Sequence, residues 1–548
     1  MLFGTEILTT AQMRAIESGA MASGGVSGVQ LMQRAGAAVA GQIRLRWPKP
    51  GRVTVLCGPG NNGGDGYVVA QLLARADWQV RVLGLDNEPG PDAADMKRCW
   101  QDAGPILPLT RAELRRNEAD VYVDAIFGTG LTRPPKGEIA EILDYLGGLG
   151  GQDGHFRQRL VAVDCPSGLC MDSGAFLGKA RQSGADDLHA RLTVTFDSPK
   201  PGHLLERGPA CCGELVVADI GLHDWRIRAS EPHQDPRTAP LTAIWPRFCV
   251  PDARRPAAAQ DRWAEWLEKR QSNGGHKFSH GHAIVLAGPA GHGGAARLAA
   301  RAALRVGAGL VTICPPGAAL IEHAGPPDAL MRRAVDDAAA LTYVLHDQRI
   351  GALCLGPGCG VERARELLPP LLNSGRACVL DADALTALAA LAAMGFHGLH
   401  DRCVLTPHAG EFSRLFPDLA ERLAARPDHG PALSRLDATR EAAKRSGAVV
   451  LLKGPDTVIA APPRRDNANA TGQAVIHSAF DIPWLATAGA GDVLAGIIAG
   501  LLARGLTPQT AASLGALLHG ATARGVGPGL IADDLPDRIP GAFRDLVP

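Results

Sequence analysis

The sequence lacks several features that would place it in a special class of protein. Lysine plus arginine and aspartate plus glutamate are equal at 56 each among 548 residues, so the formal net charge is +0. Nucleic-acid-binding proteins usually carry a basic excess, so this balance argues against nucleic acid as a partner. The 12 cysteines form no CxxC pair and no regular framework. Free thiols in a reducing compartment therefore fit better than disulfides.

The sequence also shows no segment typical of a membrane span or a targeting signal. The longest apolar run near the C-terminus, VLAGIIAGLLA, is closed by Arg504, well short of the ~20 residues that a bilayer span requires. The first residues, MLFGTEILTTAQMRAIE, contain an early acid and no basic stretch leading into an apolar one. We therefore expect no membrane association and a cytoplasmic location.

What is present is a repeated alternation of apolar strands and helical segments. A chain of 548 residues is too long for one hydrophobic core, and two such series predict two α/β domains in tandem with parallel sheets. The expected strands of the first are RVTVLCGPG, WQVRVLGL, VYVDAIFGTG, RLVAVDCPSGL, RLTVTFDSP and GELVVADIGL. Those of the second are HAIVLAGPAG, GLVTICPPG, GALCLGPGCG, ACVLDADAL, CVLTPHAGEF and AVVLLKGPDTVIA. We place the domains at 1–222 and 276–548, with a linker over 223–275.

The stretch ATAGAGDVLAG, residues 486–496, sets an aspartate behind two glycines at the start of a helical segment. Backbone amides at a helix start favour an anion such as a phosphate. Asp492 would then lie beside a nucleotide's terminal phosphate, where it could take a proton from an attacking hydroxyl. The alternative interpretation is that Asp492 only caps the helix.

Four further motifs follow expected strands in the second half: LGPGCG, DADAL, TPHAGEF and KGPDT. Together with GAGD, in this order, they resemble the ribokinase-like fold, and specifically the ADP/ATP-dependent NAD(P)H-hydrate dehydratases. The opening HKFSHGHAIVLAGPAGHGGAARLAARAALRVGAGLVTI is similar to that family as well. Two positions depart from the family pattern: Phe278 replaces a usual Gly, and Ala490 replaces a usual Thr or Ser.

The resemblance implies roles for individual residues of the second domain. Asp492 would be the catalytic base. Hydrate-binding residues would be Ala295, Gly358, His408 and Asp492, although His408 alone could be an ordinary strand-end histidine. Nucleotide-binding residues would be Lys453, Gly454, Pro455, Asp456, Thr457, Gly489 and Gly491. The co-substrate would be ADP or ATP with a magnesium ion, and the two-domain arrangement resembles bacterial members that use ADP.

In the first half, CGPGNNGGDGYVVAQLLA again runs from a strand through glycines into a helix. It does not match GxGxxG, so the dinucleotide fingerprint is not met. Asn61, Asn62 and Asp65 supply oxygens here, and Asp124, Asp164 and Ser167 supply more at two later strand ends. Oxygen donors that meet at one edge of a sheet indicate a hard cation or acid–base chemistry.

These motifs, with LMQRAGAAVA upstream and TVTFDSPKPGHLL downstream, resemble the NAD(P)H-hydrate epimerase family, the YjeF N-terminal domain. The resemblance implies a Rossmann-like α/β/α three-layer domain and a potassium ion held by Asn62, Asp124 and Ser167. Asp164 would be catalytic. The hydrate-binding residues would be Asn61, Asn62, Gly63, Gly64, Asp65, Gly128, Thr129, Gly130, Leu131, Thr132, Arg133, Pro134 and Asp164.

Together the two resemblances imply a bifunctional isomerase and lyase that repairs hydrated NADH and NADPH, here expected to be a homo-oligomer. The epimerase would interconvert the R and S hydrates, and the dehydratase would restore NAD(P)H from the S hydrate while ADP becomes AMP and phosphate. Two alternatives stay open. The second domain could be another ribokinase-like small-molecule kinase, and the first could be a non-catalytic binding or dimerisation module.

Overall fold

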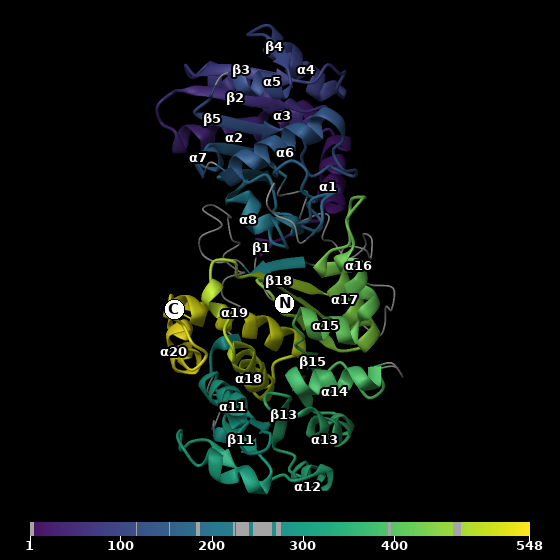
Figure 1. The fold of residues 1–548 in the computed structure, drawn as a ribbon, viewed down its shortest axis with the longest axis vertical. Coiled ribbons are helices and arrows are strands. Elements are labelled where there is room, and N and C mark those ends of the chain that lie inside the picture. The colour runs from purple at the N-terminus through teal and green to yellow at the C-terminus, as the bar shows by residue number, and fades with distance from the viewer. Residues whose placement is uncertain are drawn as a thin grey trace.

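The computed structural model describes residues 5–116, 118–152, 154–181, 187–222, 225, 241–244, 266–269, 276–392, 396–463 and 473–547. Two sheets organise this part of the chain. We call the elements around the seven-stranded sheet the first domain and those around the eleven-stranded sheet the second domain. Figure 1 shows the first domain above the second.

The first sheet is parallel throughout, in the order β4-β3-β2-β5-β6-β7-β8. Its strands are β2 (Arg52–Cys57), β3 (Gln79–Gly84), β4 (Ile106–Pro108), β5 (Val121–Ala125), β6 (Leu160–Val163), β7 (Leu192–Phe196) and β8 (Glu214–Ala218). The chain order reverses between β2 and β5, and open α/β sheets bind ligands beyond the carboxyl ends of the strands at such a reversal.

Helices cover both faces of this sheet (Figure 1). On one face α2, α3 and α4 contribute Val39, Val69 and Met96 to a buried cluster, and on the other α6 contributes Ile142 and Leu146. Parallel strands need this double cover because both faces of the sheet are apolar. The helices are α1 (Thr10–Ala22), α2 (Gly28–Arg46), α3 (Asn61–Ala74), α4 (Pro91–Gln101), α5 (Arg111–Arg116), α6 (Gly137–Gln152), α7 (Gly154–Arg157) and α8 (Gly208–Cys212). The expected Rossmann-like three-layer arrangement is confirmed.

The second sheet has the order β1-β9-β18-β17-β16-β15-β14-β13-β10-β11-β12. Its strands are β1 (Thr5–Glu6), β9 (Leu241–Ile244), β10 (His282–Leu286), β11 (Leu310–Cys314), β12 (Met331–Arg332), β13 (Ile350–Leu355), β14 (Ala377–Leu380), β15 (Cys403–Leu405), β16 (Val449–Leu452), β17 (Asp456–Ala460) and β18 (Ala474–Ser478). From β12 to β16 every pairing is parallel, and the order reverses between β10 and β13. Strands β16, β17 and β18 then pair antiparallel.

Helices also lie on both faces of the second sheet. They are α11 (Gly293–Arg305), α12 (Ala338–Val344), α13 (Val361–Asn373), α14 (Ala382–Ala392), α15 (Ala409–Leu415), α16 (Pro417–Ala424), α17 (Arg435–Ser446), α18 (Ala490–Ala503), α19 (Pro508–Val526) and α20 (Asp534–Leu546). Helices α11, α18, α19 and α20 share one buried cluster, and α12 to α17 share the other. All twelve expected strand segments thus contain a strand, and the predicted fold class is confirmed for both domains.

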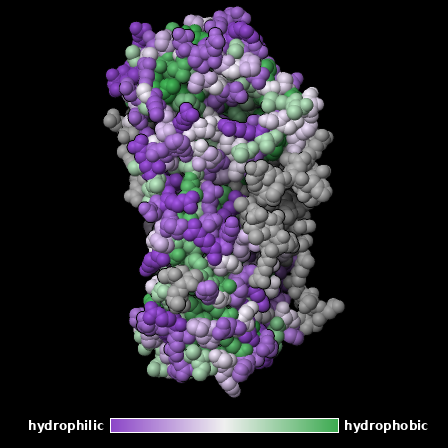
Figure 2. All heavy atoms as spheres, turned by 90° about the vertical axis from the view of Figure 1, so that its right-hand side faces the viewer, coloured by the Kyte–Doolittle hydropathy of each residue, from purple (hydrophilic) through white to green (hydrophobic). Residues whose placement is uncertain are grey.

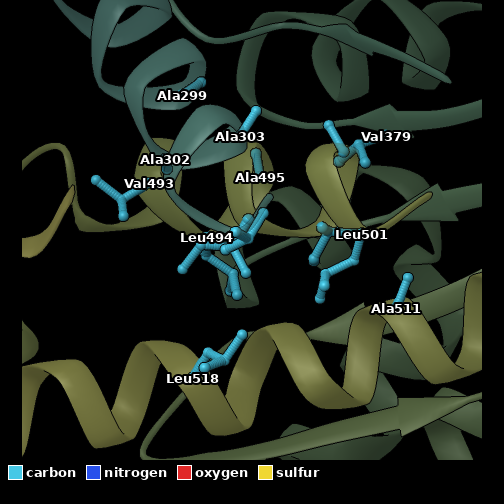
Figure 3. Close-up of a cluster of buried hydrophobic side chains, with 14 of the residues drawn as sticks. Ala299, Ala302, Ala303, Val379, Val493, Leu494, Ala495, Leu501, Ala511 and Leu518 are labelled. Atoms are coloured by element: carbon cyan, nitrogen blue, oxygen red, sulfur yellow. The ribbon is translucent and has the colours of Figure 1, made fainter. Parts of the chain in front are cut away.

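Helix α18, which carries Asp492, is buried over most of its length. Figure 3 shows Val493, Leu494 and Ala495 between the alanines of α11 and the side chains of α19. A Cβ added at Gly496 would lie 2.0 Å from the Ala299 carbonyl oxygen, so only glycine permits this approach to α11. The close packing fixes the helix and therefore the position of Asp492 in its first turn.

Five strands lie outside the expected segments, namely β1, β4, β9, β12 and β18, and two of them, β1 and β9, bear on the expected domain boundaries. Thr5–Glu6 pairs antiparallel with Leu241–Ile244, which in turn pairs parallel with β18. The expected boundaries put both segments outside the second domain, whereas the pairing puts them at the edge of its sheet. Such pairing uses backbone groups and needs no side-chain pattern, so the residue types here carry little sign of it. Most of the expected linker 223–275 lies outside the described residues.

The surface and the thiols fit the expectations from composition. On the face shown in Figure 2, hydrophilic residues are spread over both domains among smaller apolar areas. Within the described ranges, no helix combines the length and the apolar character needed to cross a membrane. Every cysteine in those ranges is a free thiol, and all but Cys99 are buried.

Candidate functional site

The first group of candidate residues lies at the carboxyl edge of the first sheet, where its strand order reverses. Strand β2 leads through Gly58 into α3, and β5 ends beside it at Asp124 and Ala125. A Cβ added at Gly58 would lie 1.8 Å from the Ile126 carbonyl oxygen. Glycine therefore lets the two strand ends approach. No side chain caps α3, which begins at Asn61, so its first amides remain available at this edge.

Asp124 and Ser167, two of the three expected potassium ligands, are in direct contact. The Ser167 hydroxyl donates to Oδ1 of Asp124 at 2.6 Å, and the Ser167 backbone N–H donates to Oδ2 at 2.8 Å. Asp124 is fully buried, and among the described residues it has no ion pair. Burial raises the pKa of this carboxyl to about 6, although the hydrogen bonds from Ser167 lower it.

Asn62 and Asp164 meet across Gly128. A Cβ added at Gly128 would lie 2.9 Å from Oδ1 of Asn62 and 3.4 Å from Oδ2 of Asp164. The Thr129 N–H donates to the same Asp164 oxygen at 3.3 Å. The expected hydrate loop of residues 128–134 is therefore joined to both polar groups. The Nδ2 atom of Asn62 is buried and has no hydrogen-bond partner among the described residues.

Asp164 follows β6 with a left-handed backbone, φ +64°, and its carboxylate is held by buried donors. The Thr195 hydroxyl donates to Oδ1 at 2.7 Å, and Nζ of Lys200 lies 3.1 Å from the same oxygen. Burial is the largest single influence and would raise the pKa of Asp164, but the charge of Lys200, the Thr195 hydrogen bond and His203 together outweigh it, so the pKa is lowered. Asp164 is therefore a carboxylate that stays ionised.

Lys200 and His203 complete this site and were not assigned from the sequence, although they lie in the TVTFDSPKPGHLL stretch. Both are buried, at 1% and 2% exposure. The Lys200 N–H donates to Nδ1 of His203 at 3.0 Å, which leaves Nε2 to donate to the Asp164 carbonyl at 2.9 Å. Burial, with Lys200 nearby, lowers the pKa of His203 to about 4. The histidine is neutral and fixes the segment around Asp164.

Asp65, the remaining carboxylate expected to bind the hydrate, is also buried. Burial raises its pKa well above the ordinary value, and the charges of Asp164 and Glu17 raise it further. The first site therefore holds one carboxylate that favours the ionised form and one that favours the protonated form. Such a pair can take up and return a proton.

The second group lies at the start of α18. Gly489 is the N-cap residue with φ +90°, and no side chain caps the helix. Asp492 is the third residue of α18, so the interpretation of Asp492 as the helix cap is wrong. A Cβ added at Gly491 would lie 3.4 Å from Nζ of Lys453, which brings the expected nucleotide lysine against the GAGD turn.

Lys453 pairs with carboxylates other than Asp492. Its Nζ donates to Oδ1 of Asp381 at 2.6 Å and lies 3.8 Å from Oε2 of Glu411. Burial raises the pKa of Asp492 to about 6, the charges of Asp381 and other carboxylates add to that rise, and Lys453 opposes it. Asp381, Asp383 and Glu411 were not assigned, although DADAL and TPHAGEF contain them.

Two of the expected hydrate-binding residues of the second domain, Gly358 and Ala295, lie side by side, and a third, His408, caps a helix. Gly358 and Ala295 are in contact, because a Cβ at Gly358 would lie 3.3 Å from Cβ of Ala295. His408 is the N-cap of α15, and its Nδ1 accepts from the Gly410 N–H at 3.0 Å. Its side chain is 55% exposed, so Nε2 can still meet a ligand from solvent.

The KGPDT turn is held together by its own threonine. The Thr457 hydroxyl donates to the Gly454 carbonyl at 2.7 Å and accepts from the Gly454 N–H at 3.2 Å. Thr457 therefore shapes the loop.

Of the two departures from the family pattern, Phe278 precedes β10 and so lies at the end of that strand opposite to the site. Ala490 is buried, and its N–H bonds to the Thr487 carbonyl at 3.3 Å, so the turn keeps its shape without a hydroxyl.

Two polar sites, one on each of two doubly wound sheets, define a two-domain α/β enzyme. Comparison with known proteins makes this specific. Residues 283–534 match the family model described as NAD(P)H-hydrate dehydratase, and residues 28–202 match that of the YjeF-related protein N-terminus. The bifunctional NAD(P)H-hydrate repair enzyme of Coxiella burnetii is 34% identical over 97% of this chain and 98% of its own. The enzyme of the same name from Moorella thermoacetica is 35% identical over 98% and 97%.

The chain therefore belongs to the family of bifunctional NAD(P)H-hydrate repair enzymes. A solved ADP/ATP-dependent NAD(P)H-hydrate dehydratase from Bacillus subtilis, co-crystallised with ATP and Mg²⁺, is 26% identical over 52% of this chain and 97% of its own, with a TM-score of 0.43. The prediction of a bifunctional hydrate-repair enzyme is confirmed. The comparisons do not favour the alternative of a small-molecule kinase with a non-catalytic first domain.

Proposed function

We propose that the site around Asp164 interconverts the R and S hydrates of NADH and NADPH, and that the site around Asp492 dehydrates the S hydrate at the expense of ADP. The proposed domains are residues 1–222 and 276–548, with the edge of the second sheet completed by β1 and β9. Free thiols in the described ranges support a reducing compartment, and we propose the cytoplasm. We also propose a homo-oligomer as the working form.

In the first site, Asp164 is the proposed proton-handling group. Inversion at C6 of the hydrated ring requires a bond at that carbon to break and re-form, with a proton removed and returned. Asp164 is held ionised by Lys200 and is oriented by Thr195 and Thr129, so it is ready to accept that proton. The first turn of α3, Asn61–Asp65, and the loop Gly128–Pro134 would hold the hydrate beside it.

The donor set beside Asp164 fits a potassium ion. Asp124 is a buried carboxylate whose charge lacks a cationic partner in the described chain, and Oδ1 of Asn62 faces Gly128 at the same sheet edge. Asn62, Asp124 and Ser167 would hold the ion, and all three offer oxygen atoms, which hard cations prefer. When bound, it supplies positive charge that favours ionised Asp124 and an oxygen-bearing substrate. Asp124 and Ser167 would fix the start of the hydrate loop through Phe127.

In the second site, Asp492 is the proposed general base. It would take the proton of the C6 hydroxyl while that oxygen attacks the terminal phosphate of ADP, which leaves AMP. The ring nitrogen then expels phosphate from C6, and loss of a proton from C5 restores the dihydronicotinamide. Gly489 and Gly491 present backbone N–H groups to the transferring phosphate. Lys453, which follows β16, would contact the same phosphate.

A magnesium ion would accompany the nucleotide. Across the described ranges, no group of three or more His, Cys, Asp or Glu side chains is arranged to hold a metal by itself. Magnesium in nucleotide sites is bound mainly through phosphate oxygens and water, with one or two carboxylates. Asp381, Asp383 and Glu411 are the carboxylates whose charges reach Asp492 and are the proposed candidates.

The observation that carries the proposal for the second site is the raised pKa of Asp492 at an uncapped helix start. A general base works best when its pKa lies near the working pH, and about 6 is close to that range. The same helix start favours phosphate, so the base and the phosphate would be adjacent.

The test is to incubate the full-length protein with a mixture of both hydrate epimers, with and without ADP or ATP. Regenerated dihydronicotinamide is followed by its near-ultraviolet absorbance. We expect the whole mixture to be recovered with nucleotide and none without it. Recovery that stops when the S epimer is used up would show that the first domain is not an epimerase. No recovery with either nucleotide would overturn the dehydratase assignment.

A further inference from the structure

The first domain inserts part of its chain into the second. The segment after Lys200 includes Leu204 and Leu205, which are buried in the same apolar cluster as Leu452 and Val458. Those two residues flank the Lys453–Thr457 loop, the proposed nucleotide loop. Removing leucine side chains from water stabilises the arrangement that buries them. The contact between the domains is therefore fixed directly beside the nucleotide loop.

The next residue makes a polar contact with that loop. The Glu206 backbone N–H donates to Oδ2 of Asp456 at 2.9 Å, and Asp456 is 4% exposed. Oδ1 of Asp456 lies 3.2 Å from Nε of Arg435, an ion pair without hydrogen-bond geometry. Nη2 of Arg435 donates to the Lys453 carbonyl at 3.1 Å. Both ends of the loop are thus tied to a network that the first domain enters.

Arg181, also in the first domain, closes the network. It forms an ion pair with Glu206, and both side chains are largely buried. Its Nη2 also donates to the Leu433 carbonyl at 2.6 Å, and its Nε donates to the Ala425 carbonyl at 3.3 Å. Leu433 is two residues before Arg435. Arg181 therefore has two roles. It holds the backbone that leads to Arg435, and it holds Glu206, whose N–H bonds Asp456.

The same interface reaches the other site. The Gly430 N–H donates to the Thr132 carbonyl in the proposed hydrate loop at 2.9 Å. The segment that ends at Glu206 begins at Lys200, which contacts Asp164. One interface therefore touches a substrate loop of each proposed site. More hydrogen bonds and apolar contacts lead to the nucleotide loop than to the hydrate loop.

We propose that the first domain completes the nucleotide site of the second, with Arg181 and Arg435 as positioning residues for the Lys453–Thr457 loop. This inference rests on the proposed function, because it takes that loop to bind the nucleotide. The physical reason is that Asp456 is a buried carboxylate. If its partners are withdrawn, the cost of the unpaired charge is relieved by moving the loop. The hydrate would bind away from this loop, and the base Asp492 lies in α18, so both keep their geometry.

The experiment uses the full-length protein and the variant Arg181→Met, which keeps side-chain volume but removes the charge and the donors. We expect the KM for ADP to rise roughly tenfold, which is within the range for positions that couple distant sites. The KM for the S hydrate, the kcat at saturating ADP, and the epimerisation rate should stay within about twofold. Arg181→Lys, which keeps the charge but not the planar donor fork, should lie between Arg181→Met and the native protein.

The matched control is Arg445→Met. Arg445 lies in α17, like Arg435, but pairs with Asp418 and Glu441 of the second domain at its surface. It should leave every parameter unchanged. An ADP KM within twofold of native in both Arg181 variants would overturn the inference. So would a parallel loss of kcat, both KM values and thermal stability, because that result indicates a structural role only.

A further variant separates this inference from the proposed function. Lys453→Met should raise the KM for ADP strongly, because Lys453 would touch the phosphate itself. If Lys453→Met has no effect on the nucleotide, the nucleotide site is misplaced and both proposals fail. If Lys453→Met raises the KM and Arg181→Met does not, only the contribution of the first domain is excluded.

Discussion

Each of the two proposed sites combines a lysine with an aspartate, but the two sites connect these residues differently. In the first, Lys200 contacts the reactive Asp164 directly, and the pKa of Asp164 is lowered. In the second, Lys453 contacts Asp381 at 2.6 Å, and the pKa of Asp492 rises to about 6. The comparison teaches that the partner of the lysine, and not the presence of the lysine, decides which protonation state the aspartate favours.

The difference matches the two reactions. An epimerase has to return the proton it removes, so a carboxylate beside a fixed ammonium and a second, protonated carboxyl group is suitable. A dehydratase that activates a hydroxyl needs a base that gains the proton while the hydroxyl oxygen attacks the phosphate. Asp492 is partly shielded from water and surrounded by like charge, which strengthens it as a base.

The largest effect is expected for Asp492→Asn. This variant removes the base but keeps the volume and the helix start, so dehydration of the S hydrate should slow by at least ~10²-fold. ADP should still bind, and epimerisation should be unchanged. Turnover is measured by the absorbance of regenerated NADH, and ADP binding by calorimetry. Asp537→Asn, at a surface ion pair on α20, is the control. Near-normal turnover of the Asp492→Asn variant would falsify the assignment.

The second prediction concerns the matching carboxylate of the first site. Asp164→Asn should slow epimerisation by roughly 10²-fold while leaving the dehydration of pure S hydrate intact. The direct assay is exchange between the R and S hydrates without nucleotide, followed by chromatography. Asp120→Asn, an exposed aspartate of the same domain, serves as control. Full epimerisation by the Asp164→Asn variant would instead support a first domain that only binds.

A smaller effect is expected from pH, and it separates the two sites without mutation. Asp492 has a raised pKa of about 6, so it becomes protonated and inactive as the pH falls through 6. One unit below, the kcat/KM of dehydration should be lower by about tenfold. Asp164, with a lowered pKa, stays ionised over the same range. Epimerisation and dehydration rates measured from about pH 5 to 8 at saturating potassium should therefore separate on the acid side. A parallel decline of both would contradict the contrast between the sites.

An effect on stability, and not on rate, is expected from potassium. Binding at Asp124 should stabilise the first domain by about 2.7 kcal/mol at a hundredfold excess over the dissociation constant. The effect should weaken as the pH falls through about 6, because a protonated Asp124 binds a cation poorly. Thermal unfolding with potassium or with a large organic cation at equal ionic strength measures it. Asp124→Asn should abolish the difference, and an equal response of the variant would show that the ion binds elsewhere.

Prediction from sequence worked where chemistry is local to a strand end. Asn61–Asp65 follows β2 and forms the first turn of α3, and Gly489–Asp492 begins α18. The doubly wound sheets bring both to the expected edges. It missed Lys200, because a lysine in a Pro- and Gly-containing stretch gives no sign that it is buried. It also missed Asp381 as the partner of Lys453, since the two residues lie 72 positions apart.

The sequence by itself determined the two α/β domains, the order of their motifs and the chemical groups at each strand end. These follow from apolar periodicity and from residue types within short windows. Only the tertiary structure decided which lysine meets which carboxylate and how the domains touch. The bond from the Glu206 N–H to Asp456 spans 250 positions and uses a backbone donor that every non-proline residue has. Such a contact leaves no mark in the local pattern, because it depends on the packing of distant segments.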